Sequence, residues 1–241
     1  MLQQAVPFGR VERLLPSVYS GLLASLCWII GDLLLVGFTP QPESYPLLSQ
    51  TYAHSLDVDL ATHMLLGSTN RLMWGALIAV FSLPLYLYSA FSVGRLVQGK
   101  WRLAVFLLVF LGFAYAPVAH AGFFYVGEIY KAVIHTDSSA HSVLLETGSG
   151  FVRLLKICWI TSLGFTAIGW LVFGTLVATG RTILKRSALW MNPIVFVLGI
   201  SLVSALLPSP VQDWLACAVF NEAHFLFFAM LLIVLSRHRH I

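Results

Sequence analysis

Charged residues are scarce in this sequence. Asp, Glu, Lys and Arg make up 10% of the 241 residues, 59% are apolar, and the mean hydropathy is +0.86. Soluble globular domains are about 25% charged and about 45–50% apolar. So few charges cannot cover a water-soluble fold, and this excludes disordered proteins, secreted disulfide scaffolds and nucleic-acid-binding modules. The composition predicts a protein embedded in a membrane.

Cysteine and the familiar catalytic motifs are also scarce. The three cysteines, Cys27, Cys158 and Cys217, lie within apolar runs, so we expect buried thiols and no disulfide framework. The sequence contains no HExxH, GxSxG, Walker or CxxC motif. No internal repeat is visible, so an inverted-repeat transporter lacks support.

What the sequence has instead is long apolar runs. A membrane-spanning helix needs about 20 mainly apolar residues at a rise of about 1.5 Å per residue. Segments that meet this requirement lie at about 16–38, 70–93, 102–129, 154–179, 189–207 and 211–235. Pro208 and Pro210 separate the last two segments, which form a tight hairpin or, alternatively, a re-entrant pair. We predict an all-α polytopic membrane protein, with six transmembrane helices in one bundle and a single domain over residues 1–241.

The basic residues predict the orientation of these helices. They occur before the first segment, in alternate loops and at the C-terminus: Arg10, Arg13, Arg95, Lys100, Arg102, Arg181, Lys185, Arg186, Arg237 and Arg239. The intervening 39–69 loop has no Lys or Arg, and the 131–153 loop is mixed. Because Lys and Arg concentrate on the cytoplasmic side, both termini are predicted to be cytoplasmic. We expect a multi-pass protein of the cell membrane, the inner membrane in a bacterium.

The 39–69 loop is predicted to lie on the outer side. Leu56, Leu60, Met64 and Gly67 recur in it at helical spacing. This pattern favours a short interfacial helix over the outer mouth of the bundle, and an ordinary solvated loop is the alternative.

Ionisable residues within the predicted helices gather in the outer half of the membrane. Asp32 lies about 24 Å and His120 about 27 Å from the cytoplasmic ends of their helices. Asn221, Glu222 and His224 lie about 15–20 Å from the outer end of the last helix. Ionisable groups at such depths are costly and mark functional sites. We therefore expect a polar cavity that opens to the outer face above an apolar cytoplasmic half.

These residues suggest acid–base chemistry on an amphipathic small molecule or a lipid. Asp32, Glu222 or Glu128 would act as the base and His120 or His224 as the acid. Arg71 and Lys156 would hold an anionic headgroup. The other candidate binding residues are Asn70, Glu128 and Asn221.

Other interpretations use the same residues. His63, His120 and His224 could bind a divalent metal such as zinc, although no histidine pair has the i, i+4 spacing that makes this specific. A small-molecule or proton-coupled transporter is one alternative, and a structural or assembly subunit, whose polar residues only pair helices, is another. The expected partners are membrane lipids and an amphipathic small molecule, not nucleic acid. Whether the chain forms a homo-oligomer is left open.

Several short motifs resemble those of a known group of proteins. They are Gly31-Asp32-Leu33-Leu34, Asn70-Arg71-Leu72 with Gly75 and Pro84, His120, and Asn221-Glu222. This pattern resembles uncharacterised bacterial six-pass inner-membrane proteins of unknown function. The resemblance implies a six-helix bundle and no particular activity.

Overall fold

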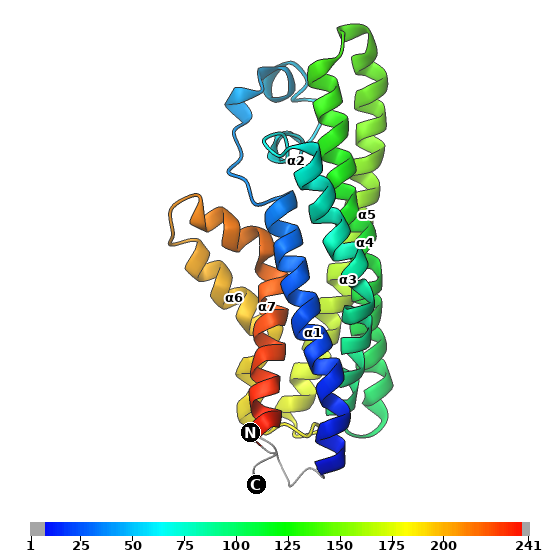
Figure 1. Ribbon diagram of the computed structural model, residues 1–241, viewed down its shortest axis with the longest axis vertical. Helices are drawn as coiled ribbons and strands as arrows, with labels where there is room; N and C mark the ends of the chain where they lie inside the picture. Colours follow the sequence, from blue (N-terminus) through cyan, green and yellow to red (C-terminus); the bar gives the residue numbers. More distant parts are fainter. Residues whose placement is uncertain (1–7, 238–241) are drawn as a thin grey trace.

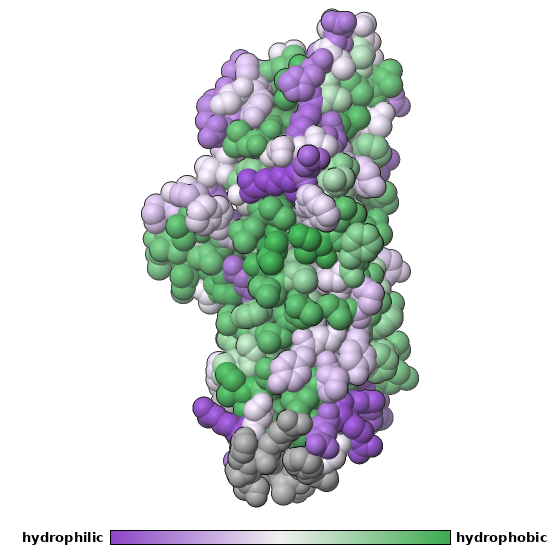
Figure 2. Space-filling view, viewed as in Figure 1, coloured by the Kyte–Doolittle hydropathy of each residue, from purple (hydrophilic) through white to green (hydrophobic). Residues whose placement is uncertain are grey.

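The computed structural model describes residues 8–237, which form an elongated helical bundle (Figure 1). Within these residues, five helices are long and apolar enough to cross a membrane. They are α1 (Phe8–Leu35), α3 (Thr69–Leu96), α4 (Arg102–His135), α5 (Ser138–Ala178) and α7 (Val211–Arg237). On the face seen in Figure 2, a broad apolar region crosses the bundle, with hydrophilic residues mainly toward its two ends. The prediction of an all-α, polytopic membrane protein is confirmed.

The described ends of the chain lie at the same end of the bundle (Figure 1). The α3–α4 and α5–α6 connections lie there too, joined by backbone hydrogen bonds from Gln98 N to Arg181 O and from Ile183 N to Leu96 O. These connections and the helix ends next to them carry six of the ten basic residues used to predict the orientation: Arg95, Lys100, Arg102, Arg181, Lys185 and Arg186. Arg239 and the side chain of Arg10, which contributed to that prediction, lie outside the described residues.

The α1–α3 interface is built on two glycines. A Cβ atom on Gly31 would lie 2.9 Å from the carbonyl oxygen of Gly75, and one on Gly75 would lie 3.0 Å from the carbonyl oxygen of Gly31. Small residues allow membrane helices to approach this closely. The contact brings Asp32, the residue after Gly31, next to the part of α3 around Gly75.

The α4–α5 connection differs from the predicted 131–153 loop. Helix α4 continues to His135 and α5 begins at Ser138, so only residues 136 and 137 separate them. Leu144, Leu145 and Val152 pack against the apolar core beneath them, and this packing makes the segment helical. Helix α5 has 41 residues, a length of about 61 Å, against about 30 Å for the hydrocarbon core of a bilayer.

The predicted 189–207 helix is shorter and interrupted. A 3₁₀ segment, Arg186–Met191, precedes α6 (Pro193–Ser204), which has 12 residues. Asn192 separates the two, because its side-chain oxygen caps α6 by accepting a 3.0 Å hydrogen bond from Ile194 N. Helix α6 is therefore about 18 Å long, and it packs against α7.

The 39–69 segment forms a packed cap at the end of the bundle opposite to the described chain ends (Figure 1). We call this end the outer end, the segment the outer cap, and the opposite end the inner end. It contains two single helical turns, Pro42–Ser44 and Leu47–Thr51, and the short helix α2 (Val58–His63). A helix is therefore present where the spacing of Leu56, Leu60 and Met64 favours one. Leu48, Ala61 and Met64 are buried in an apolar cluster with residues of α1, α3, α4 and α5.

Two apolar clusters make up the core. The larger one lies toward the end that carries the termini and includes Val18, Trp28, Phe113 and Phe227. The smaller one lies beneath the outer cap and includes Leu35, Leu72 and Val126. On α1, Asp32 falls between Trp28 of the first cluster and Leu35 of the second. The buried polar residues of the site occupy this boundary.

Candidate functional site

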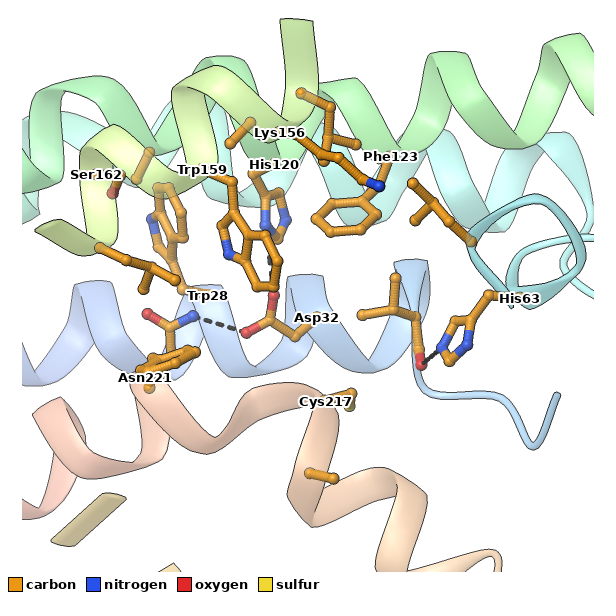
Figure 3. A pocket seen from close by; sticks show the side chains of 18 of the residues that line it. Trp28, Asp32, His63, His120, Phe123, Lys156, Trp159, Ser162, Cys217 and Asn221 are labelled. Carbon is orange, nitrogen blue, oxygen red and sulfur yellow. Dashed lines mark hydrogen bonds and ion pairs between the residues drawn. The ribbon is translucent and has the colours of Figure 1, made fainter. Parts of the chain in front are cut away.

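A cavity of about 630 Å³ lies at the boundary between the two apolar clusters. Its walls come from α1, α3, α4, α5, α7 and the outer cap, and Figure 3 shows many of its side chains. The lining residues that carry the argument below are Trp28, Asp32, Asp57, Asp59, His63, Tyr86, Phe113, His120, Phe123, Lys156, Trp159, Asp213, Phe220, Asn221 and His224. Binding sites for small molecules have volumes of about 300–1,000 Å³ and mainly apolar walls with a few polar groups. The cavity is of this kind.

Three residues from three helices form the inner end of the cavity. Tyr86 Oη on α3 donates a 2.8 Å hydrogen bond to Asn221 Oδ1 on α7. Asn221 Nδ2 in turn donates a 2.6 Å hydrogen bond to Asp32 Oδ2 on α1 (Figure 3). Asn221 therefore uses both ends of its amide, and the carboxyl group of Asp32 is held at the cavity wall.

His120 lies on the other side of Asp32. Its Nε2 atom is 3.3 Å from Gly75 O, and its Nδ1 atom is 3.4 Å from Asp32 Oδ1. Because a carbonyl oxygen only accepts hydrogen bonds, Nε2 must carry a proton. A hydrogen bond between Nδ1 and Asp32 then needs one further proton, held either by the carboxyl or by the imidazole. An Asp32–His120 pair that is hydrogen-bonded in this way shares one proton and carries no net charge.

His224 is held by a different contact. Trp170 Nε1 on α5 donates a 2.9 Å hydrogen bond to His224 Nε2 on α7. An indole N–H is a donor only, so Nε2 accepts, and the proton of the neutral ring is on Nδ1. The Nδ1 atom is buried and has no hydrogen-bond partner within residues 8–237. This contact joins α5 and α7 on the inner side of the cavity.

The outer mouth of the cavity is polar. Lys156 Nζ lies 2.7 Å from Asp57 Oδ2, and this ion pair, mainly through its hydrogen bond, lowers the pKa of Asp57. Asp57 Oδ1 also caps α2 by accepting a hydrogen bond from Leu60 N. Asp213 accepts a 2.7 Å hydrogen bond from the hydroxyl of Thr39. The outer cap is thus tied to α5 and α7 around the entrance.

The structure brings several of the predicted site residues together. Six of them line the cavity: Asp32, His63, His120, Lys156, Asn221 and His224. Four others do not line it: Asn70, Arg71, Glu128 and Glu222. Asp32, His120, Asn221 and His224 were singled out by their depth along their helices, and so was Glu222, which does not line the cavity.

Two of the predicted residues outside the cavity, Arg71 and Glu128, have local partners. Arg71 Nη2 donates a 2.8 Å hydrogen bond to Leu33 O, near the end of α1, and its guanidinium lies 4.0 Å from the ring centroid of Phe38. Glu128 accepts hydrogen bonds from Thr69 and Lys131. These contacts hold helix ends together, so the structure does not place Arg71 where it could hold a ligand headgroup in the cavity.

The three histidines considered for a metal site are separated by their partners. His63 Nε2 is 2.7 Å from Val36 O, and His120 and His224 face Asp32 and Trp170 as described above. In the part of the chain that the structure describes, no three His, Cys, Asp or Glu side chains are grouped so that they could hold a metal ion. A zinc site normally has three or four such ligands around the ion.

Several important residues of the site were not singled out by the sequence. Tyr86 and Asp213 are far along the chain from Asp32, and nothing in the local sequence marks them. Trp28 does carry a signal, because it precedes Asp32 by four positions and so shares its helix face. Trp159 could have been found in the same way from Lys156, since the two are three positions apart on α5.

Comparison with known proteins gives a family but no activity. No curated protein and no solved structure matches the chain. The described helices, cavity and polar network all lie within residues 8–238, which match the model of a family of unknown function (DUF6796). The chain therefore belongs to this family of unknown function.

Proposed function

We propose that this protein binds one amphipathic small molecule or lipid in the cavity between α1, α4, α5 and α7. The volume of about 630 Å³ suits a single molecule of that size. Trp159 and Phe220 line the cavity on its α5 and α7 sides and are 42% and 40% exposed. Below them Trp170 and His224 close the gap between these two helices. Such an arrangement gives an apolar molecule a path from the lipid phase.

We further propose a six-pass topology with both termini in the cytoplasm of a bacterium. The ends of α1 and α7 lie at one end of the bundle, as do the basic loops, and this supports an even number of passes. Helix α6 and the outer part of α7 lean away from the other helices (Figure 1). With only 12 residues, α6 would cross just part of the bilayer, or need local thinning of it. In this topology the cavity opens to the outer side.

The observation that carries the binding proposal is the position of the polar network. Asp32, Tyr86, His120 and Asn221 come from four different helices, and all four line the cavity. Polar side chains that only pair helices would be enclosed within helix–helix contacts. The position of this network on a cavity wall favours a site over a structural pairing.

The same network could also convert the bound molecule. The one-proton Asp32–His120 pair can give a proton to a ligand atom near Asp32 or accept one from it. In such a reaction Asp32 would be the acid or base, and His120 would position it and exchange the proton with it. A transporter receives less support, because the core on the inner side of the network is apolar, with Trp28, Phe227 and Phe228 buried there.

Native mass spectrometry of the protein extracted in a mild detergent tests the binding proposal. Ala216 lines the cavity but is exposed, so Ala216→Trp fills the entrance without disturbing the core. The matched control is Ala167→Trp on an exposed, non-lining position of α5. We expect a bound molecule of defined mass in the wild type and in the control, and its loss from Ala216→Trp. Equal occupancy in the two variants, or none in the wild type, would contradict the proposal.

A further inference from the structure

The charges that line the cavity are mostly negative, although the chain as a whole carries a net charge of +4. The lining side chains near the mouth that can carry a charge are Lys156 and the carboxyl groups of Asp57, Asp59 and Asp213. Lys156 is already neutralised by Asp57 at 2.7 Å. Asp59 and Asp213 therefore leave the mouth negative. This field would repel an anionic headgroup, such as the one that Arg71 and Lys156 were expected to hold.

The walls of the cavity are aromatic. Side chains of this type come from five helices: Trp28, Tyr86, Phe113, Phe123, Trp159 and Phe220. Trp28 lies beside the polar network, with its ring centroid 5.5 Å from that of Tyr86 and 4.9 Å from that of His120. The face of an aromatic ring attracts an organic cation, and the attraction increases when water is excluded. Aromatic walls also suit an apolar body, so they favour a lipophilic cation over a hydrated inorganic ion.

Asp32 supplies an independent observation at the inner end. It is 9% exposed, and a carboxylate buried this far needs a charged partner to stay ionised. Its contacts are the neutral amide of Asn221 and the imidazole of His120. Within residues 8–237 no lysine or arginine forms an ion pair with it. A cationic ligand in the cavity could take the place of the single proton of the Asp32–His120 pair.

Resting on the proposed binding function, we propose that the ligand is a lipophilic organic cation, an amine or quaternary onium group on an apolar body. Its charge lies toward Asp32, and its body lies between the aromatic side chains of α4, α5 and α7. The negative mouth formed by Asp59 and Asp213 favours entry of such a molecule over an anion of the same shape. No hydrogen-bond donor is required of the ligand, since attraction to a carboxylate and to ring faces depends on charge alone.

Two probes of matched size and opposite charge test this inference. Tritiated tetraphenylphosphonium is the cation and tetraphenylborate the anion, each measured on the full chain in phosphatidylcholine nanodiscs, with empty nanodiscs subtracted. We expect saturable binding of one cation per chain and no saturable binding of the anion. Saturable binding of the anion with similar affinity, or no saturable binding of the cation, would overturn the inference.

Variants place the binding in the cavity. Asp32→Asn should weaken cation binding by about tenfold or more, the loss expected for one charge-assisted contact. The matched control is Glu146→Gln, which removes a carboxylate from an exposed position of α5 outside the cavity and should leave binding unchanged. Lys156→Gln removes the lysine and leaves Asp57 unpaired, so it should strengthen binding. The higher affinity of Lys156→Gln for the cation tests the inference even if Asp32→Asn fails to fold. If Lys156 had a purely structural role, its replacement would not raise the affinity for the cation.

Failure of this inference and failure of the binding function give different results. If a molecule copurifies with the wild type and is lost from Ala216→Trp, but the cation does not bind saturably, the cavity binds a ligand of another class. If nothing copurifies and neither probe binds saturably, both proposals are overturned.

Discussion

Asp32 Oδ1 lies 3.4 Å from His120 Nδ1, and this contact joins α1 to α4 at the inner end of the cavity. The carbonyl of Gly75, which His120 also faces, belongs to the α3 backbone that packs against Gly31 of α1. The three helices therefore meet at the Asp32–His120 pair. The geometry of this pair depends on two glycines, one histidine and one carboxyl group.

Asp32→Asn is expected to fold with nearly wild-type stability. The new side chain can accept the hydrogen bond from Asn221 with its oxygen and donate one to His120 Nδ1 with its nitrogen. Asp32→Leu should instead destabilise the protein by about 1–3 kcal/mol, because buried groups of Asn221 and His120 lose their partner. Thermal unfolding in detergent measures the difference. Equal destabilisation by both variants would show that the hydrogen-bond pattern is not the one described here.

Gly75→Ala should destabilise the bundle. The added Cβ would lie 3.0 Å from the carbonyl oxygen of Gly31 and closer still to the Leu35 side chain, and backbone atoms cannot move aside cheaply. We expect a loss of about 1–3 kcal/mol from overpacking. Gly164→Ala on α5 is the matched control, since a Cβ there meets nothing within 4 Å. That control should be neutral or more stable by up to about 1 kcal/mol, through its higher helix propensity. If both variants behave alike in unfolding measurements, the close α1–α3 approach is absent.

The Lys156–Asp57 ion pair should make a small contribution to stability that depends on pH. The hydrogen bond from Lys156 lowers the pKa of Asp57 in the folded state. The contribution is therefore fully present above the unfolded-state pKa of about 3.9, and it is lost as the pH falls through the lower folded-state value. Both side chains are partly exposed, so it amounts to less than about 1 kcal/mol at neutral pH.

A double-mutant cycle measures this dependence. Lys156→Gln should lower the unfolding temperature slightly at pH 7, and the difference from the wild type should close as the pH falls toward about 3. In an Asp57→Asn background the same substitution should give no pH-dependent difference. A difference that grows on acidification would contradict the assigned pair.

Cysteine labelling tests the proposed topology. In a variant whose three native cysteines are replaced, single cysteines are placed by Thr136→Cys in the α4–α5 turn, Ser209→Cys in the α6–α7 turn and Lys100→Cys in the α3–α4 connection. A membrane-impermeant maleimide added to intact cells should label the first two positions and not the third. Labelling at position 100 would reverse the orientation. Labelling of position 136 without position 209 would show that α6 does not reach the outer surface.

Parts of the site could be predicted because depth along a helix follows from counting residues. Each residue adds about 1.5 Å, so Asp32, His120 and Asn221 could be assigned to one level once the helix ends were known. The angle of a residue around its helix also follows from the sequence, and it grouped Asn221 with His224. Which helix lies opposite a given face does not follow, and this is why Arg71 and Glu128 were grouped with the cavity but lie outside it.

The 131–153 segment shows a second limit. Its mixed polarity is typical of a loop. The segment is helical instead, and its polarity is mixed because it extends α4 and α5 beyond the length that is needed to cross a bilayer. The apolar residues that make it helical, Leu144, Leu145 and Val152, pack against the smaller apolar cluster, which contains residues of α1, α3, α4 and the outer cap. That packing joins segments far apart in the chain, and no local pattern of hydropathy contains it.

The sequence by itself determined that this chain is a polytopic helical membrane protein, and it predicted that the intramembrane polar groups lie at one depth. Those conclusions depend on composition, on helix length and on the spacing of residues along one helix. Only the tertiary structure decided that Asn221 bridges Tyr86 and Asp32, and that these three residues line a cavity with an acidic mouth. The physical reason is that a cavity is defined by the gaps between helices, and these gaps depend on close approaches such as Gly31 against Gly75, which involve two helices at once.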